Sequence, residues 1–268
     1  MINLKIRYYD SYTDDFVKTR NQDYELKENY KWIHNNIFYK IFSYILYYIF
    51  LLFSLLYIKI VYRVSYKNRK VLKGYKSYFM FSNHTLPFGD AIIPLITNFP
   101  NRPYYVADKA NLGIPILGKL LPMLGILPIP NTVHKMQSFV DSVNYHIEHN
   151  HPIIIYPEAH VWPYNTFIRE FPKTSFNFPV SLNVPIISCF VEMIDTNYKN
   201  TDDFNYVNCI VHILKPIIPD KNKSDRCNSI HMANIDYIQK KEAYRKAYGK
   251  KLDYTFDYSD IAGLVKKN

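Results

Sequence analysis

The feature that most constrains the fold of this chain is an uncharged apolar segment, residues 41–58, which reads IFSYILYYIFLLFSLLYI. As an α-helix these 18 residues would be about 27 Å long, slightly less than the ~30 Å hydrocarbon core of a bilayer. Because 40 mixed polar residues precede the segment and no small-residue cleavage site follows it, it does not resemble a signal peptide. It also lacks the polar stripe of a soluble helix. We therefore expect a membrane-associated helix at residues 37–62.

Two placements of this helix remain open, because its tyrosines suit both the headgroup region and the ends of a spanning helix. A run of basic residues follows it with no intervening acid: Lys59, Arg63, Lys67, Arg69, Lys70, Lys73 and Lys76. If the helix spans, this run orients its carboxyl-terminal side toward the cytoplasm. In either placement it would attract anionic headgroups. The expected location is the membrane, with the catalytic domain facing the cytoplasm.

Composition narrows the class of protein. With 268 residues, of which 48% are hydrophobic, the chain is long and apolar enough for one ordinary core. Its net charge of +10 favours phosphate-rich partners, but the basic residues cluster beside the apolar segment, which suits headgroups better than nucleic acid. The cysteines form no CxxC pair, so neither a disulfide framework nor a zinc site is expected.

The chain divides into four parts by composition. We expect a loosely held polar arm at 1–36, the membrane-associated helix at 37–62, a catalytic domain at 63–250 and a charged tail at 251–268. Within the domain, β-rich runs alternate with helical stretches, which indicates an α/β fold. Strands are predicted near 77–82, 103–107, 153–156, 184–191 and 207–214. Helices are predicted at 135–149 and from about 224 to 248, the second ending at Gly249.

Two strand ends carry candidate catalytic groups. The first predicted strand runs into Asn83 and His84, and Asp90 follows after a turn that contains Pro87 and Gly89. An imidazole with one nitrogen bonded to a carboxylate can use the other as a general base toward an alcohol. The strand in IIIYPEAHVW likewise ends at Pro157 and Glu158. A His and an Asp in one loop can also simply bond to backbone, so spacing alone does not establish catalysis.

The order of these motifs resembles that of the glycerolipid acyltransferases of the lysophosphatidic acid and glycerol phosphate (PlsC-like) type. The resemblance covers roughly residues 70–215, in four blocks: Asn83, His84 and Asp90; Gly125 to Asn131; Pro157 and Glu158; Val184 and Pro185. It implies a mixed sheet flanked by helices, His84 as the base and Asp90 as its orienting partner. Asn83, Gly125, Asn131, Pro157 and Glu158 would then contribute to the substrate site.

Three departures from the family pattern bear on the substrate. Five residues separate His84 from Asp90 where the family usually has four, and Gly89 would absorb the extra residue as a bulge. The second block ends in Asn131 in place of Arg, and the third continues Ala159, His160, Val161 in place of Gly-Thr-Arg. Two anion ligands are thus missing. Three cations could replace the missing arginines as anion ligands: Lys109, Lys135 and Arg169. Each of them could equally be an ordinary surface charge. His160 and Trp162 are expected either to frame the acceptor or to pack in the loop.

We expect an O-acyltransferase that moves a fatty acyl group from acyl-CoA, acyl carrier protein or acyl phosphate to a lysophospholipid such as 1-acyl-glycerol-3-phosphate, in phospholipid biosynthesis. The partners are then the donor, possibly as acyl carrier protein, the lipid acceptor and the membrane; no nucleic acid, metal or further cofactor is expected. Two alternatives remain open. The acceptor could be a non-phosphorylated lipid or glycolipid, or the protein could be a catalytically inactive lipid-binding membrane protein.

Overall fold

The computed structural model describes residues 7–17, 21, 23–199, 205–252 and 264–266. A seven-stranded sheet with the order β2-β8-β7-β3-β6-β4-β5 forms its centre. The strands are β2 (Ser65–Lys67), β3 (Phe79–Phe81), β4 (Tyr104–Asp108), β5 (Ile126–Ile129), β6 (Ile153–Ile155), β7 (Ile186–Lys199) and β8 (Asn205–Ile213). The run from β7 to β5 is parallel, whereas β8 is antiparallel to β7. The predicted mixed α/β sheet is confirmed.

The central strands are short, continuous apolar runs because both faces of the sheet are covered. Alternate residues of β3 point to opposite faces: Met80 packs in one hydrophobic core, and Phe79 and Phe81 pack in the other. β6 repeats the pattern, with Ile154 in the first core and its two neighbours in the second. These residues are at most 5% exposed, so both cores meet at β3 and β6.

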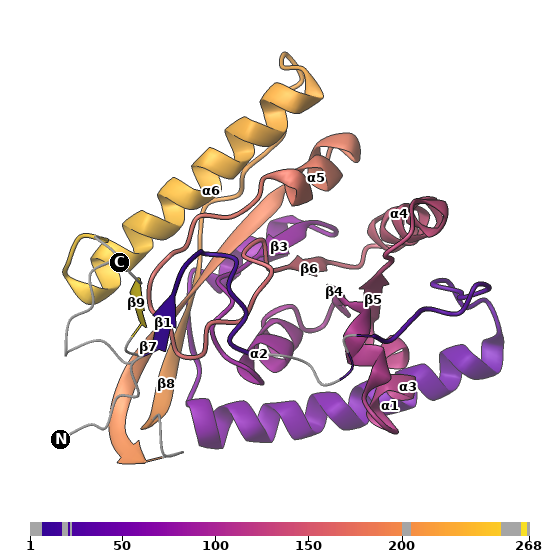
Figure 1. Ribbon diagram of the computed structural model, residues 1–268, viewed down its shortest axis with the longest axis horizontal. Helices are drawn as coiled ribbons and strands as arrows, with labels where there is room; N and C mark the ends of the chain where they lie inside the picture. Colours follow the sequence, from indigo (N-terminus) through magenta and orange to yellow (C-terminus); the bar gives the residue numbers. More distant parts are fainter. Residues whose placement is uncertain (1–6, 18–20, 22, 200–204, 253–263, 267–268) are drawn as a thin grey trace.

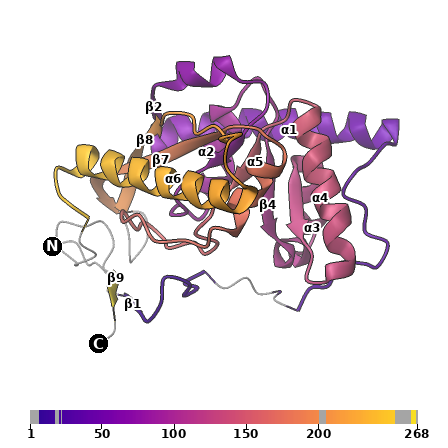
Figure 2. The ribbon, with the colours of Figure 1, turned by 90° about the horizontal axis from the view of Figure 1, so that it is seen from above.

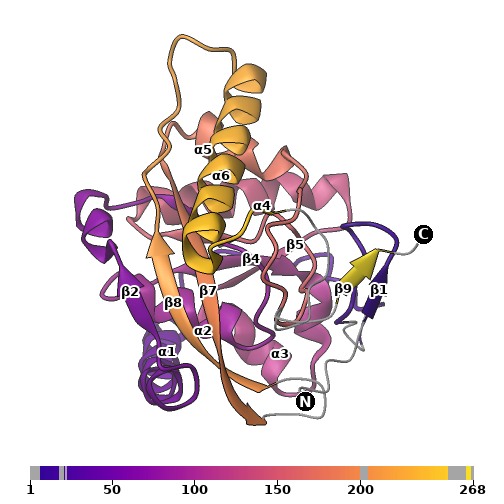
Figure 3. The same ribbon diagram turned by 90° about the vertical axis from the view of Figure 1, so that its left-hand side faces the viewer.

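Helices cover both faces of the sheet, as Figure 3 shows. On one face lie α1 (Ile37–Tyr57), its continuation η1 (Ile58–Tyr62) and α2 (Gly89–Thr97); on the other lie α4 (Val133–Glu148), α5 (Asn177–Ser181) and α6 (Asp225–Tyr248). The short elements are η2 (Arg69–Gly74), η3 (Lys109–Gly113), α3 (Leu117–Leu120), η4 (Leu121–Leu124) and η5 (Thr174–Phe176). The two helices predicted from periodicity, α4 and α6, are confirmed within two residues at each end.

Helix α1 runs along the side of the domain (Figure 1). Its side-chain cap is Asn36, whose amide oxygen accepts hydrogen bonds from the main-chain N–H groups of Phe38 and Tyr39. One face is buried throughout its length, at Ser43, Tyr47, Leu51, Ser54, Ile58 and Tyr62. The opposite face exposes apolar residues such as Ile49 and Leu52, each 62% exposed. Ile37–Tyr62 is the one helix among the described residues that is long and apolar enough to cross a membrane, which suggests membrane association.

The prediction of a loosely held N-terminal arm is wrong for the residues that the structure describes. Tyr9, Leu26 and Trp32 are buried, and the Trp32 indole donates to the carbonyl of Pro128 at 2.9 Å. β1 (Arg7–Tyr9) pairs in parallel with β9 (Leu264–Lys266), so the described part of the predicted solvated tail also pairs. In Figure 2 the described parts of the arm run along one side of the molecule between β1 and α1. We call residues 9–16 the strap.

Candidate active site

The predicted site residues gather at the carboxyl edge of the parallel strands. His84 follows β3, Glu158 follows β6, Lys109 follows β4 and Asn131 follows β5. Because these strands are parallel and adjacent in the order β3-β6-β4-β5, the four residues leave the sheet at the same edge. This edge is where open α/β sheets bind ligands.

The predicted pairing of His84 with Asp90 is present: the imidazole Nδ1 lies 2.7 Å from the carboxylate Oδ2. The same oxygen accepts hydrogen bonds from the main-chain N–H groups of Thr85, at 2.9 Å, and Leu86, at 3.0 Å. Asp90 can reach all three donors because α2 begins at Gly89 and places it in the first turn. The additional residue in the loop therefore does not separate the base from its partner.

Gly89 has a different role from the predicted bulge. It is the first residue of α2, and its φ is not positive. A Cβ atom at this position would lie 2.8 Å from the Cβ of Leu86 and 3.2 Å from the ring of Tyr62. Gly89 is therefore required for close packing of the loop against η1, not for an unusual backbone conformation.

Burial and stacking shape the His84–Asp90 pair. Asp90 is 5% exposed, and its burial raises the pKa of its carboxyl group, while the hydrogen bond from His84 opposes that shift. The imidazole of His84 stacks on the ring of Tyr156, with ring centroids 4.3 Å apart. The Tyr156 hydroxyl donates to the main-chain carbonyl of Asp90 at 2.6 Å. No feature of the sequence singled out Tyr156, because it continues the apolar run of β6 directly before Pro157.

Asn83 holds the loop to the sheet. Its amide oxygen accepts from the N–H of Val191 at 2.8 Å, and its amide nitrogen donates to the Val191 carbonyl at 3.2 Å. Asn83 thus pairs with β7 as a strand residue would, and it is 2% exposed. The prediction that Asn83 contacts substrate is not supported, because both ends of its amide face β7.

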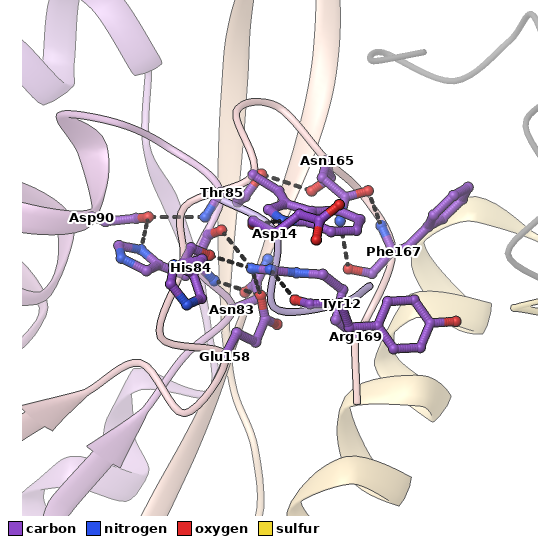
Figure 4. Close-up of polar contacts among 12 residues, drawn as sticks. Tyr12, Asp14, Asn83, His84, Thr85, Asp90, Glu158, Asn165, Phe167 and Arg169 are labelled. Atoms are coloured by element: carbon purple, nitrogen blue, oxygen red, sulfur yellow. Dashed lines mark hydrogen bonds and ion pairs between the residues drawn. The ribbon is translucent and has the colours of Figure 1, made fainter. Parts of the chain in front are cut away.

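Arg169 is not the surface cation that the sequence predicted. It has no exposed surface, and it forms an ion pair with Glu158, which is 5% exposed. Its guanidinium also donates to the main-chain carbonyls of His160, at 2.5 Å, Tyr12, at 3.2 Å, and His84, at 3.4 Å (Figure 4). Burial lowers the pKa of Arg169 and the Glu158 carboxylate opposes this. Both side chains are buried and bond to each other, which is a structural arrangement and not the exposed position expected of a substrate contact.

The rest of the third block forms the loop around this ion pair. Pro157 is buried behind β6, and Ala159 adopts a φ of 64°, a left-handed conformation that explains why the family usually has Gly there. His160 is half-buried at the rim, where its Nδ1 lies 4.0 Å from the carboxylate of Asp15. Trp162 is 1% exposed and packs in the loop, so of its two predicted roles the structure supports packing.

The two remaining candidates meet a carboxylate from the N-terminal arm. Glu25 accepts hydrogen bonds from the ammonium group of Lys109 at 2.5 Å and from the side-chain amide of Asn131 at 2.8 Å. These two bonds lower the pKa of Glu25, with a smaller contribution from the charge of Lys135. Lys135 itself donates to the main-chain carbonyl of Leu26. The cluster is thus a site that already holds an anion, and no motif in the sequence pointed to Glu25.

Gly125 lies at the wrong end of its strand for the predicted substrate role. It precedes β5, at the amino edge of the sheet, whereas His84 follows β3 at the carboxyl edge. Its φ is 102°, and a Cβ atom there would lie 2.9 Å from the carbonyl of Pro103. Gly125 therefore allows the turn into β5 and does not contact a ligand beside His84.

A small cavity of about 10 Å³ borders Asp90 between α2 and the sheet. Its lining is largely apolar: Met80, Ser82, Asp90, Ile93, Pro94, Thr97, Tyr156, Cys189, Val191 and Val211. A volume of this size admits at most one water molecule. This cavity is therefore too small to hold a substrate.

Comparisons with known proteins agree with this geometry. Residues 63–192 match the family model described as Acyltransferase. The structure is similar to the crystal structure of the 1-acyl-sn-glycerophosphate (LPA) acyltransferase PlsC from Thermotoga maritima, with a TM-score of 0.52 and 15% sequence identity. That match covers 80% of this chain and 97% of the other. A search of curated proteins found no match. Residues 63–192 are therefore similar to the Acyltransferase family, and the chain has a PlsC-like fold.

Proposed function

We propose that the protein transfers a fatty acyl group from an activated donor, acyl-CoA, acyl-ACP or acyl phosphate, to the hydroxyl of a lysophospholipid such as 1-acyl-glycerol-3-phosphate. The 2.7 Å hydrogen bond between His84 and Asp90, at the edge where the parallel strands end, carries this proposal. Support also comes from the family match over residues 63–192. Phospholipid biosynthesis is the process in which such a product is used.

The mechanism follows from the orientation of the imidazole. Because the Asp90 carboxylate accepts only, Nδ1 carries the proton and Nε2 has a free lone pair. Nε2 takes the proton of the acceptor hydroxyl as its oxygen attacks the donor carbonyl carbon. The tetrahedral intermediate collapses, the bond to the donor sulfur or phosphate oxygen breaks, and the imidazolium returns the proton to that leaving group. A positioned base of this kind contributes about 10²- to 10⁴-fold.

Replacement of His84 by Ala tests this role. We expect the full chain, reconstituted in vesicles with labelled acyl-CoA and a lysophosphatidate, to lose at least about 10²-fold in kcat. The control is His149→Ala, because His149 is an exposed residue at the end of α4 that bonds the carbonyl of Tyr145 in the helix before it. Unchanged turnover by the His84→Ala variant would show that His84 is not the base, whereas an absence of turnover by the parent chain would favour the inactive lipid-binding alternative.

We infer that α1 lies in the membrane interface and does not cross the bilayer. The support is the stripe from Ser43 to Tyr62, which packs against the domain along nearly the whole helix. The hydroxyl of Ser43 bonds the carbonyl of Met123, and the guanidinium of Arg102 stacks on the rings of Tyr44 and Tyr47. Because α1 is fixed to the domain along its length, the domain would lie against the membrane surface wherever α1 lies in the interface. The exposed apolar face then lies against one leaflet, on the cytoplasmic side.

A phosphate-free acceptor is the second candidate, because Glu25 already neutralises the anion site of Lys109 and Asn131. An acceptor phosphate would have to displace this carboxylate, whereas a glycolipid or lipid alcohol would not. A competition assay with equimolar lysophosphatidate and a monoacylglycerol of the same chain separates the candidates. Predominant acylation of lysophosphatidate supports the first candidate, and predominant acylation of the neutral lipid supports the second.

A further inference from the structure

The main chain of the catalytic histidine is held on both sides by one buried ion pair. The N–H of His84 donates to the carboxylate of Glu158 at 3.4 Å, and its carbonyl accepts from the guanidinium of Arg169, also at 3.4 Å. The N–H of Trp162 donates to the same carbonyl at 3.2 Å. The imidazole is held separately, by Asp90 and the ring of Tyr156. Two independent sets of contacts therefore determine where the imidazole lies.

Arg169 in turn depends on the strap. The guanidinium stacks 4.4 Å from the centroid of the Trp162 ring and donates to the carbonyl of Tyr12. The indole N–H of Trp162 donates to the carbonyl of Asp14 at 2.8 Å, and three strap rings pack on the indole. These rings are Tyr9, Tyr12 and Phe16, with centroids 4.8, 6.3 and 5.2 Å from that of Trp162. Without the strap, this side of Arg169 would lose a carbonyl acceptor and its cover.

The chemistry of the pair indicates a role in geometry more than in stability. A buried Arg–Glu pair loses the hydration of both charges. Replacement of such a pair by neutral residues of similar size therefore often leaves the stability of a protein unchanged or higher. Neutral residues cannot, however, direct donors to carbonyls in three separate segments. One planar guanidinium does this here for the strap, the His84 loop and the third block.

We propose that Arg169, enclosed by the strap, is a positioning residue that holds His84 for proton transfer, so that the N-terminal strap is part of the catalytic apparatus. This inference rests on the acyl transfer proposed above. Arg169 touches no reacting atom, because it is fully buried, its Nη1 and Nη2 groups bond to main-chain carbonyls and Glu158, and its Nε is buried without a partner among the described residues. Its loss should lower kcat and leave KM for the acceptor unchanged, since a displacement of the base near 1 Å costs about 10²-fold.

The central experiment separates position from stability with a double variant. Arg169→Met alone leaves the Glu158 charge unpaired and should destabilise the protein, whereas Arg169→Met with Glu158→Gln removes both charges of the pair. We expect the double variant to unfold near the temperature of the parent chain, to keep its KM and to lose roughly 10- to 100-fold in kcat. The matched control is Arg226→Met, because Arg226 is exposed on α6. A double variant with kcat within twofold of the parent would overturn the proposal.

Two further measurements keep the inference open to refutation if the double variant folds poorly or the parent is inactive. Trp162→Phe keeps a ring for Arg169 but removes the N–H that bonds Asp14, and we expect a smaller loss of kcat with unchanged KM. Hydrogen exchange of the peptide around His84 should be faster in both variants while exchange in α4 is unchanged. Unchanged exchange around His84 would contradict the positioning role. An inactive parent chain with faster exchange in the variants would instead count against the acyl transfer.

Discussion

At the scale of single residues, Asp90 combines a cost in stability with a role in the site. Its burial raises the pKa of its carboxyl group, which means that the folded state disfavours the ionised form. Three donors nevertheless converge on its Oδ2, from the ring of His84 and the main chain of Thr85 and Leu86. The sequence predicted the His84–Asp90 pair, but it could not reveal that Asp90 also closes the loop between them.

Asp90→Asn should therefore separate stability from activity. The neutral amide can still accept from the three donors, so we expect the free energy of unfolding at pH 7 to be unchanged or higher. We expect kcat to fall by about 10²- to 10⁴-fold, because the imidazolium formed during catalysis loses its anionic partner. Urea unfolding and steady-state kinetics measure the two quantities. A variant that is clearly less stable and still fully active would contradict both expectations.

Glu25 allows a test of the anion site at the same scale. Glu25→Gln removes the charge that neutralises Lys109, so we expect KM for a phosphate-bearing acceptor to fall about two- to fivefold, the range for an exposed ion pair. KM for a phosphate-free acceptor should not change. The control is Glu28→Gln, an exposed carboxylate of the same arm. Equal KM values for Glu25→Gln and the parent chain would show that Glu25 does not compete with the acceptor.

At the scale of elements, α1 behaves as an amphipathic helix although nearly every residue in it is apolar. Both faces of the helix carry apolar side chains, but only one face is covered by the domain. Tyr47 and Leu51 pack on the domain, whereas Ile49 and Leu52 are exposed. A composition of this kind predicts a membrane segment but not which face meets the protein. The hydrogen bonds of Ser43 determine which face of α1 meets the protein: its hydroxyl donates to the carbonyl of Met123 and accepts from the guanidinium of Arg102.

Charges on the exposed face of α1 should weaken membrane binding without unfolding the domain. For Ile49→Glu with Leu52→Glu, we expect at least about a tenfold loss of partitioning into vesicles, since burial of one such side chain contributes roughly 1.5–3 kcal/mol. Stability should change by no more than about 0.5 kcal/mol per substitution, as for other exposed positions. Flotation with phosphatidylcholine–phosphatidylglycerol vesicles measures the binding, with Ser138→Glu on the exposed face of α4 as control. Retained flotation would show that another surface binds the membrane.

At the scale of the whole molecule, the two edges of the sheet have different chemistry. The carboxyl edge carries the groups that act in the proposed reaction. The amino edge holds a cluster of two buried residues, His146 and Arg102, and two half-buried ones, His151 and Tyr104. His146 stacks on Tyr104 with ring centroids 3.6 Å apart, and neither ring nitrogen has a hydrogen-bond partner among the described residues. Burial lowers the pKa of His146 to about 3, and the nearby charges of His151 and Arg102 add to this effect.

This cluster predicts how stability depends on pH. Because the folded state holds His146 neutral down to about pH 3, the unfolded chain, with an ordinary pKa of about 6.5, binds more protons between these values. The free energy of unfolding should therefore fall as pH decreases below about 6.5, by up to roughly 1.4 kcal/mol per pH unit for this residue. His146→Phe keeps the stack and should reduce the slope, whereas His134→Phe, at an exposed position of the same helix, should not. Urea unfolding at pH 7 and pH 4.5 measures it; equal slopes in the two variants would refute the assignment.

The sequence by itself determined the α/β class, the two long helices of the domain, the apolar segment and the pairing of His84 with Asp90. These follow from local periodicity and from one short loop, which depend on neighbours along the chain. Only the tertiary structure decided that Arg169 is buried against Glu158 and that the polar arm packs across the site. It also decided that Gly125 allows a turn of the main chain and that Asn83 bonds to the main chain of β7. Those contacts join segments up to 157 residues apart, and no local pattern records which charge will find a partner when such segments meet.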